Sequence, residues 1–139
     1  SVNNNGGPFG CIIVKDNQII SEGYNMVTSQ NDPTAHGEIV AIRNACKKLS
    51  TFNLTGCELY SSCEPCPMCL SAIYWSHIEK VFFGNTRLDA AKIGFDDNFI
   101  YEEFSLEISK RKIPLIQKLE NEAKEAFDIW GKKTDKIEY

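Results

Sequence analysis

Residues 58–84 have the sequence ELYSSCEPCPMCLSAIYWSHIEKVFFG, and this stretch contains a strand, a helix and a second strand in succession. Its two ends, residues 58–62 and 80–84, are short runs rich in aromatic and aliphatic side chains, which is typical of buried strands. Pro67 suits the first turn of a helix, which we expect to extend to about Ser76 and to be buried, because apolar side chains surround it. A unit of this kind makes its two strands parallel and its crossover right-handed.

The residues before this stretch predict a hairpin and a second helix. Residues 10–14 and 18–24 are largely apolar runs separated by a short polar turn, which indicates two antiparallel strands. Thr34 is the expected N-cap of a helix that ends near Leu49. The apolar stripe of that helix contains Ile39, Ile42, Cys46 and Leu49 at helical spacing.

The residues after the stretch predict one more strand and one more helix. Residues 113–117 are a candidate fifth strand, and residues 119–130 carry apolar side chains along one side of a last helix, with Gly131 as its end cap. Alternation of strands and helices predicts an α/β fold, with one domain over residues 1–139 and a mixed five-stranded sheet between two layers of helices. Ligands of such sheets bind beyond the carboxyl ends of strands, beside helix N-termini.

The composition narrows the class of partner and the compartment. The formal net charge is -4 at pH 7, so we expect a small neutral substrate and no binding of nucleic acid. No apolar run approaches the ~18 residues of a membrane span, so we expect no membrane segment. Of six cysteines, Cys63, Cys66 and Cys69 lie too close together to cross-link distant elements. Such a cluster indicates a metal site in a reducing compartment, and we expect the protein in the cytoplasm.

Three side chains form the candidate metal site. Cys66 lies at the expected N-cap of its helix and Cys69 one turn later, so both sulfurs face the same way. His36 lies at the start of the preceding helix. One imidazole and two thiolates suit Zn²⁺ and leave the fourth tetrahedral position for water, as catalytic zinc sites require. We therefore expect one zinc ion per subunit.

Glu38 is the candidate catalytic base. Two thiolates cancel the charge of Zn²⁺, so a protein base has to help ionise the water at the metal. Residues two apart in the middle of a helix point to different sides. His36 and Glu38 therefore converge only if they lie in the first turn, where side chains lean back over the open end of the helix.

Other interpretations of these motifs stay open at this stage. A C-x-x-C pair, either Cys63 with Cys66 or Cys66 with Cys69, also fits redox chemistry. Cys63 could instead complete a closed structural zinc site with three cysteines and one histidine. We interpret Cys63 as a buried thiol at the end of its strand, and Cys11, Cys46 and Cys57 as core cysteines.

The pattern His36-Gly37-Glu38, followed by Pro65-Cys66-Pro67-Met68-Cys69, is similar to the signature of zinc-dependent deaminases. At these residues the chain resembles the cytidine deaminase superfamily, most closely its bacterial guanine deaminases. Residues 6–10, 31–36, 62–70 and 72–75 extend the resemblance. Its most specific part is residues 89–97, DAAKIGFDD.

The resemblance implies hydrolysis of the purine base guanine to xanthine and ammonia. It implies that Glu38 moves a proton from water to the ring, and that Asp97 helps to deliver a second proton to the leaving amino group. It also implies substrate contacts by Asn25, whose amide both donates and accepts hydrogen bonds, by the rings of Phe9 and Trp75, and by the backbone N–H of Gly37. As ordinary alternatives, Asn25 and Asp97 are turn residues and the aromatic side chains belong to the core.

The resemblance also implies a homodimer. Family members exchange the C-terminal segment, here about residues 118–139, so that Tyr139 completes the pocket of the neighbouring subunit. Two alternatives to a guanine deaminase remain. One is a deaminase of another base, a nucleoside or a tRNA adenosine, and the other is a zinc-stabilised binding module without activity.

Overall fold

The computed structural model describes residues 2–4 and 6–138, and the chain divides into two compact units, residues 1–99 and residues 100–139. The first unit contains η1 (Val2–Asn4), β1 (Gly10–Lys15), β2 (Gln18–Tyr24), α1 (Val27–Gln30), α2 (Gly37–Leu49), β3 (Cys57–Cys63), α3 (Pro67–Trp75), β4 (Lys80–Asn85) and α4 (Arg87–Lys92). Helix α5 (Asn98–Ser105) begins at the end of the first unit, and the second unit continues with η2 (Ile108–Lys110) and α6 (Glu120–Lys132).

The sheet of the first unit is mixed and has the order β2-β1-β3-β4. Strand β1 pairs antiparallel with β2 and with β3, whereas β3 and β4 are parallel. The predicted hairpin, the parallel pair and the α/β class are therefore confirmed. The polar loop after the hairpin contains the short helix α1, which the sequence did not indicate.

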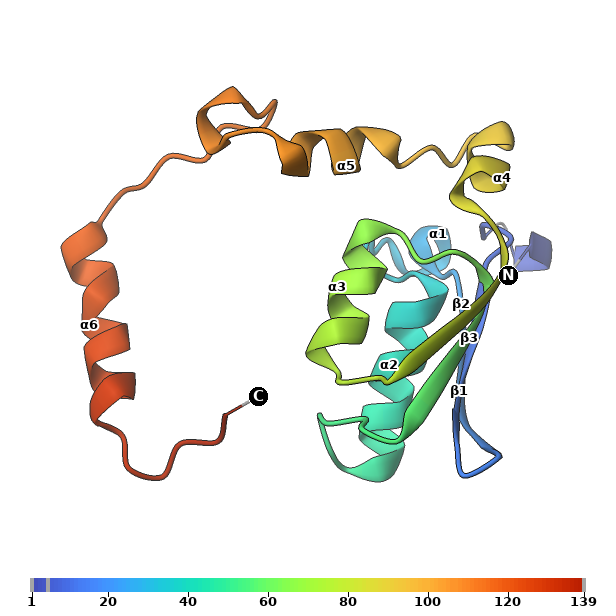
Figure 1. The fold of residues 1–139 in the computed structure, drawn as a ribbon, viewed down its shortest axis with the longest axis horizontal. Helices are drawn as coiled ribbons and strands as arrows, with labels where there is room; N and C mark the ends of the chain where they lie inside the picture. The colour runs from blue at the N-terminus through green and yellow to red at the C-terminus, as the bar shows by residue number, and fades with distance from the viewer. Residues whose placement is uncertain (1, 5, 139) are drawn as a thin grey trace. The chain divides into compact units, whose positions relative to one another are not determined.

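Helices α2 and α3 lie on the same side of this sheet (Figure 1). The buried side chains of β3 alternate, with Cys57, Leu59 and Ser61 facing the helices. On the opposite face, Tyr60 and its register partner Phe82 stack with their ring centroids 4.7 Å apart and remain exposed. The sequence predicted helices on both faces of the sheet. In the first unit, α2 and α3 cover one face.

The core lies between the sheet and the two helices. Ile13, Leu54 and Leu59 are fully buried there, together with smaller residues. Burial of each such aliphatic side chain stabilises the fold by about 1.5–3 kcal/mol. Leu54 comes from the loop before β3, outside every predicted element. It is buried because this loop closes the end of the core.

Small residues let α2 approach β2 closely. A Cβ atom on Gly23 would lie 2.3 Å from the carbonyl oxygen of Gly37 and 2.5 Å from the backbone nitrogen of Ala41. Ser21, also on β2, donates a buried hydrogen bond of 2.8 Å to the carbonyl oxygen of Ala41. The buried face of α2 accordingly contains Ala41 and Ala45, whereas Ile42, Cys46 and Leu49 of the predicted stripe are only partly buried.

Two predictions about the C-terminal part are wrong. Residues 113–117 form no strand, so β4 is an edge of a four-stranded sheet among the described residues. Apolar character alone does not make a strand, because a strand needs a neighbour with which to pair. Gly131 lies inside α6, whose C-cap is Lys133, because a glycine in the last turn does not by itself end a helix.

The expectation that α3 is buried is only partly correct. Pro67, Cys69 and Ile73 are buried, but Tyr74 and Trp75 are 74% and 66% exposed. Both lie in the last turn of α3, on the side that the first unit leaves uncovered.

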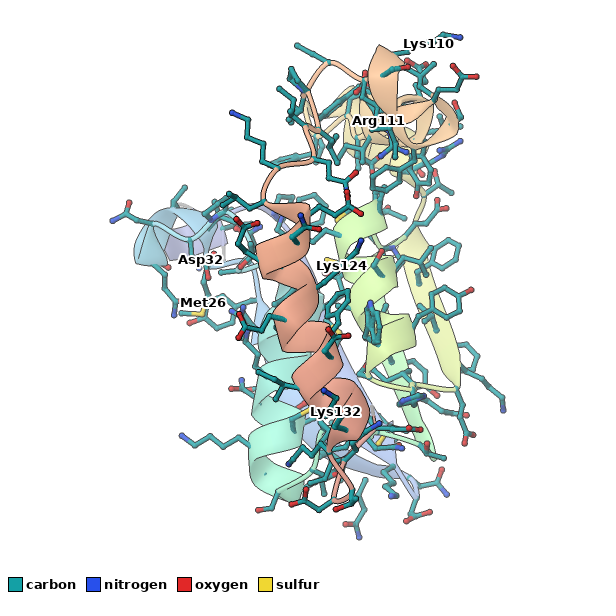
Figure 2. The ribbon with its side chains drawn as sticks, turned by 90° about the vertical axis from the view of Figure 1, so that its left-hand side faces the viewer. Met26, Asp32, Lys110, Arg111, Lys124 and Lys132 are labelled. Carbon is teal, nitrogen blue, oxygen red and sulfur yellow. The ribbon has the colours of Figure 1, made fainter. Side chains whose placement is uncertain are left out.

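The second unit has no buried side chain in its described helices. Figure 2 shows Lys110 and Arg111 at η2 and Lys124 and Lys132 along α6. Lys124 makes an ion pair of 2.7 Å with Glu120 on the polar side of α6, while Phe127 and Trp130 are exposed. Within the described residues, no helix combines the length and the apolar character needed to cross a membrane.

We predict that Gly23→Ala lowers the free energy of unfolding by ~1–3 kcal/mol, because the new methyl group collides with the backbone of α2. Urea unfolding followed by circular dichroism measures this change. Gly10→Ala is the matched control, since its Cβ would meet nothing closer than a carbonyl oxygen at 3.9 Å. Equal unfolding midpoints for the two variants would contradict the close approach of β2 and α2.

Candidate metal centre

His36 is the N-cap of α2, with an extended backbone at φ -70 and ψ 157. The predicted N-cap, Thr34, lies two residues too early. Its backbone N–H and its hydroxyl both donate to Oδ1 of Asp32, at 2.8 and 2.7 Å, so Thr34 belongs to the turn that follows α1. Figure 2 shows Asp32 and Met26 flanking that short helix.

The second ligand-bearing helix begins in the same way. Cys66 is the N-cap of α3 with φ -65 and ψ 168, Pro67 occupies the first helical position, and Cys69 lies in the first turn. Neither N-cap side chain caps its helix, since neither His36 nor Cys66 makes the usual hydrogen bond to a backbone N–H. Both side chains are therefore available for another role.

The three predicted ligands meet at one point. The ligand atoms of His36, Cys66 and Cys69 all lie within 4.8 Å of one another. Nδ1 of His36 is 3.5 Å from Sγ of Cys66 and 3.6 Å from Sγ of Cys69. Zn–N bonds of about 2.0–2.1 Å and Zn–S bonds of about 2.3 Å, meeting at a tetrahedral angle, separate N from S by about 3.6 Å. The cluster therefore fits zinc, with Nδ1 as the ligand atom of the histidine.

The protein stabilises negative charge at this cluster. The pKa of the Cys66 thiol is lowered to about 4, because it accepts hydrogen bonds from Cys69 and His36. The same contact with Cys66 raises the pKa of His36 and, together with burial and the charge of Glu38, raises the pKa of Cys69. Thiolates are the metal-binding form of cysteine, so a bound Zn²⁺ would take the place of these protons.

Glu38 lies beside the ligands and is 6% exposed. Its Oε2 is 3.4 Å from Sγ of Cys69, and its Oε1 accepts a hydrogen bond of 2.9 Å from the Ser61 hydroxyl. Since His36 precedes the helix and Glu38 lies in its first turn, the two side chains converge on Sγ of Cys69. The sequence did not single out Ser61, whose only signal is its inward register on β3.

Cys63 does not belong to the ligand cluster. It is buried at the end of β3, and its Sγ lies 3.6 Å from the carbonyl oxygen of Thr86. Burial raises the pKa of this thiol. Among the described residues, the set of side chains that could hold the metal contains only His36, Cys66 and Cys69. The geometry leaves a closed site with Cys63 as fourth ligand unsupported.

Asp97 is half-buried on the segment between α4 and α5. Burial and the negative charge of Cys66 raise the pKa of its carboxyl group, which places the group in the electrostatic range of the ligand cluster. Asp97 also lines a hollow of ≈ 320 Å³ with Arg87, Leu88, Ala91, Asp96 and Asn98.

A hydrogen bond connects the ligand loop to this segment. Glu64, two residues before Cys66, accepts the backbone N–H of Arg87 at 3.0 Å, at the start of α4. Thr86 and Asp89 form a reciprocal capping box that begins the same helix. Sequence reasoning missed these contacts, although Thr86-x-x-Asp89 is a recognisable helix-start signal.

Three predicted substrate residues gather near the start of β1 and α2. Asn25 is buried, and its Oδ1 accepts the backbone N–H groups of Gly7 at 3.4 Å and Val27 at 3.3 Å. Its carbonyl oxygen thus has the turn role that was the ordinary alternative. Phe9 packs edge-on against Phe95, with ring centroids 4.9 Å apart, and a Cβ on Gly37 would lie 3.4 Å from the carbonyl oxygen of Phe9.

The two remaining predicted contacts are not brought to this cluster by the described first unit. Trp75 ends α3, a helix of 9 residues that starts beside Cys66, so it lies ~13 Å further along the axis. Tyr139 lies outside the described residues. By contrast, Phe95 was not predicted to take part, although it lies within the specific stretch at residues 89–97.

The cluster defines a class of protein: a zinc hydrolase with three protein ligands, an open coordination position and an adjacent carboxylate. A family model, "Cytidine and deoxycytidylate deaminase zinc-binding region", matches residues 1–85. The chain therefore belongs to the cytidine and deoxycytidylate deaminase family of zinc-dependent enzymes.

Individual relatives cover more of the chain. The guanine deaminase of Bacillus subtilis is 52% identical over 134 residues, which are 96% of this chain and 86% of the relative. Its X-ray structure matches with a TM-score of 0.95 and covers 99% of this chain and 88% of that chain. A guanine deaminase from Nitrosomonas europaea matches with a TM-score of 0.65 at 33% identity, over 69% of this chain and 57% of that chain.

Enzymes that act on tRNA are also similar to this chain. The tRNA-specific adenosine deaminase of Aquifex aeolicus is 54% identical over 76 residues, which are 55% of this chain and 50% of the relative. A tRNA-specific adenosine deaminase of Buchnera aphidicola covers 94% of this chain at 37% identity.

We predict that Cys63→Ser retains close to one zinc per chain, because its sulfur faces the carbonyl oxygen of Thr86. Cys66→Ser and Cys69→Ser each lose the metal, since either change removes a ligand. Metal analysis of the purified variants by mass spectrometry measures the ratio. Loss of zinc from Cys63→Ser at a retained fold would instead support a closed structural site.

Proposed function

We propose that this protein catalyses the zinc-dependent hydrolysis of guanine to xanthine and ammonia. The observation that carries the proposal is the joint occurrence of two features. One is the cluster of His36, Cys66 and Cys69 beside the buried carboxylate of Glu38. The other is 52% identity to a guanine deaminase over 96% of the chain, which continues well beyond the zinc-binding region at residues 1–85.

Proton transfer in the proposed reaction falls to Glu38. Zinc, when bound, acts as a Lewis acid that makes water easier to ionise. Oε2 of Glu38 faces the ligand cluster, so it takes a proton from the attacking water and gives it to the ring nitrogen beside the carbon under attack. Glu38 thus returns to its carboxylate form before the next step.

A second carboxyl group assists the departure of ammonia. Asp97 has a raised pKa and lies close enough to Cys66 to sense its charge. A carboxyl group that ionises less readily holds a proton more easily, so Asp97 gives its proton to the amino group as the C–N bond breaks and ammonia leaves. The hydroxyl group added to the ring carbon loses its proton as the carbonyl group of xanthine forms, and this proton restores the Asp97 carboxyl group.

The guanine substrate is held between the hairpin of β1 and β2 and the start of α2. Phe9 offers an aromatic ring, Gly37 a backbone N–H, and Asn25 an amide whose Oδ1 already anchors the surrounding loop. Tyr139 contributes to the pocket when it comes from a second chain, whose C-terminal segment also covers Trp75.

Deamination of an adenosine in tRNA is the second candidate, because tRNA-specific adenosine deaminases are among the similar proteins. The net charge of -4 favours a free base, since binding of a polyanion requires an excess of positive charge. A cytoplasmic location fits either substrate, because all six cysteines are free thiols and a reducing compartment preserves them.

The protein acts as a homodimer in which the C-terminal segments are exchanged. The first unit exposes Tyr74, Trp75 and Phe83 around α3 and the edge strand β4, and the second unit exposes Phe127 and Trp130 on α6. Exposed apolar patches of this kind mark protein interfaces. Residues 118–139 of one chain therefore cover the first unit of its partner and bring Tyr139 to the partner's pocket, so that each deaminase domain is completed by two chains.

We predict that the purified protein releases ammonia from guanine and not from guanosine, cytosine, adenine or a tRNA anticodon stem-loop. A coupled ammonia assay with equal concentrations of the free compounds gives kcat/KM for each. Turnover of cytosine or of the RNA without turnover of guanine would replace the proposal. Turnover of none of them at full zinc loading would favour a binding module.

Two variants serve as controls for the same assay. Glu38→Gln retains zinc and loses ~10²-fold or more of kcat, the scale of positioned acid–base catalysis. Asp97→Asn also retains zinc and turns over slowly. Near-full activity of either variant removes that residue from the mechanism.

If the subunits exchange their C-terminal segments, we predict that a mixed dimer of two inactive variants recovers activity. A variant without Tyr139 and the Glu38→Gln variant are each inactive. When they are unfolded and refolded together, the mixed dimer contains one pocket with an intact Glu38 and a Tyr139 from the partner. Light scattering confirms the dimer, and the ammonia assay measures the recovered fraction.

The control carries both changes on one chain and is refolded with the unaltered protein. With exchange, each of the two sites in this mixed dimer lacks one of the two groups, so the mixed dimer is inactive; half of the activity per mixed dimer would mean that each chain covers its own pocket. A dimer without recovery in the first mixture would mean that each chain covers its own pocket.

A further inference from the structure

We propose that Ser61 is the positioning residue of the reaction: its hydroxyl holds Oε1 of Glu38 so that Oε2 faces the metal ligands. The inference rests on the proposed role of Glu38 in deamination and adds a residue that acts through it. Ser61 is neither one of the three candidate zinc ligands nor one of the residues that line the hollow beside Asp97.

The contact is short and shielded from water. Oγ of Ser61 donates to Oε1 of Glu38 at 2.9 Å, and the two residues are 8% and 6% exposed. A hydrogen bond to a charged acceptor is stronger than one between neutral groups. In a site from which water is excluded, no solvent molecule easily takes the place of this hydroxyl.

A second contact leaves the Ser61 proton available for Glu38. The backbone N–H of Cys63 donates to Oγ of Ser61 at 3.4 Å. A hydroxyl has a single proton, and an oxygen that accepts from Cys63 is free to donate that proton to Glu38. The same hydroxyl therefore links the carboxylate to the loop that leads to Cys66.

The backbone under Ser61 is held on both sides. It lies in β3, opposite Cys11 on β1 and opposite Phe83 on β4, so the sheet determines where the hydroxyl lies. Glu38, in contrast, is attached to α2 by a long side chain with several rotatable bonds. An anchor on a different element removes this rotational freedom before substrate binds.

The partner on the other carboxylate oxygen does not persist in the loaded enzyme. In this structure Sγ of Cys69 lies within hydrogen-bonding distance of Oε2 of Glu38, at 3.4 Å. When Cys69 is a metal ligand it is a thiolate and has no proton to donate. The Ser61 contact involves the opposite oxygen and is unaffected, so it keeps Glu38 oriented while Oε2 is free to exchange protons.

The test is a set of serine variants of the zinc-loaded protein with the whole chain of residues 1–139. Ser61→Ala lowers kcat for guanine by ~10–100-fold, the range for groups that orient a ligand or base at a metal site, with KM and zinc content little changed. Ser61→Thr keeps a hydroxyl and recovers most of the loss. In the Glu38→Gln background, Ser61→Ala causes no further loss, because the group it positions is already absent.

Ser21→Ala is the matched control. Ser21 also donates a buried hydrogen bond from the sheet to α2, at 2.8 Å, but to the carbonyl oxygen of Ala41. We expect Ser21→Ala to lower the unfolding midpoint about as much as Ser61→Ala does, and to leave kcat unchanged. An equal loss of kcat in both serine variants, or a further loss in the Glu38→Gln background, overturns the proposal.

A crystal structure provides a readout that does not depend on the substrate. In zinc-loaded Ser61→Ala the carboxylate of Glu38 occupies more than one rotamer, whereas in the unaltered protein it occupies one. A single unchanged rotamer in the variant overturns the positioning role. If the unaltered protein deaminates no base at all, the proposed function fails, while the rotamer comparison still decides the role of Ser61.

Discussion

The structure depends on two helix N-caps whose side chains are positioned to hold a metal ion. His36 and Cys66 each stand at the start of a helix in an extended conformation, and neither side chain caps the helix that it begins. Helix N-termini carry a partial positive charge, so the thiolates of Cys66 and Cys69 are stabilised there even though ordinary capping contacts are missing. The same residues therefore begin α2 and α3 and form the metal site.

The close packing of α2 on β2 determines where α2 begins relative to the sheet, and hence where the metal site lies. Gly23 leaves room for the backbone of α2, and Ser21 bonds to the carbonyl oxygen of Ala41. The missing side chain of Gly23 sets how closely the helix approaches the sheet, whereas the Ser21 hydrogen bond ties Ala41 of α2 to β2. A carboxylate two residues from a metal ligand is useful only if the helix begins between them, and α2 begins at Gly37.

Local patterns predicted much of the first unit and failed where distant residues decide. The hairpin, β3, the Cys66-Pro67 start of α3 and β4 follow from signals within a few residues, and the structure has them. Thr34 was wrongly expected to be the N-cap. Its hydroxyl and its backbone N–H donate to the carboxylate of Asp32, so the preceding turn continues to Thr34 and the helix begins two residues later than expected. Residues 113–117 were wrongly expected to form a strand because apolar composition does not reveal whether a neighbouring strand is available.

The amino-acid sequence by itself determined the chemistry: a histidine, two cysteines and a carboxylate at spacings that place each beside the first turn of a helix. These spacings act within one or two turns, where helical geometry is the same in any protein. Only the tertiary structure decided which imidazole nitrogen faces the sulfurs, that Cys63 turns away, and that Ser61 reaches Glu38. Such contacts join residues 23 or more positions apart, and their distances depend on strand register and helix packing, which no local pattern encodes.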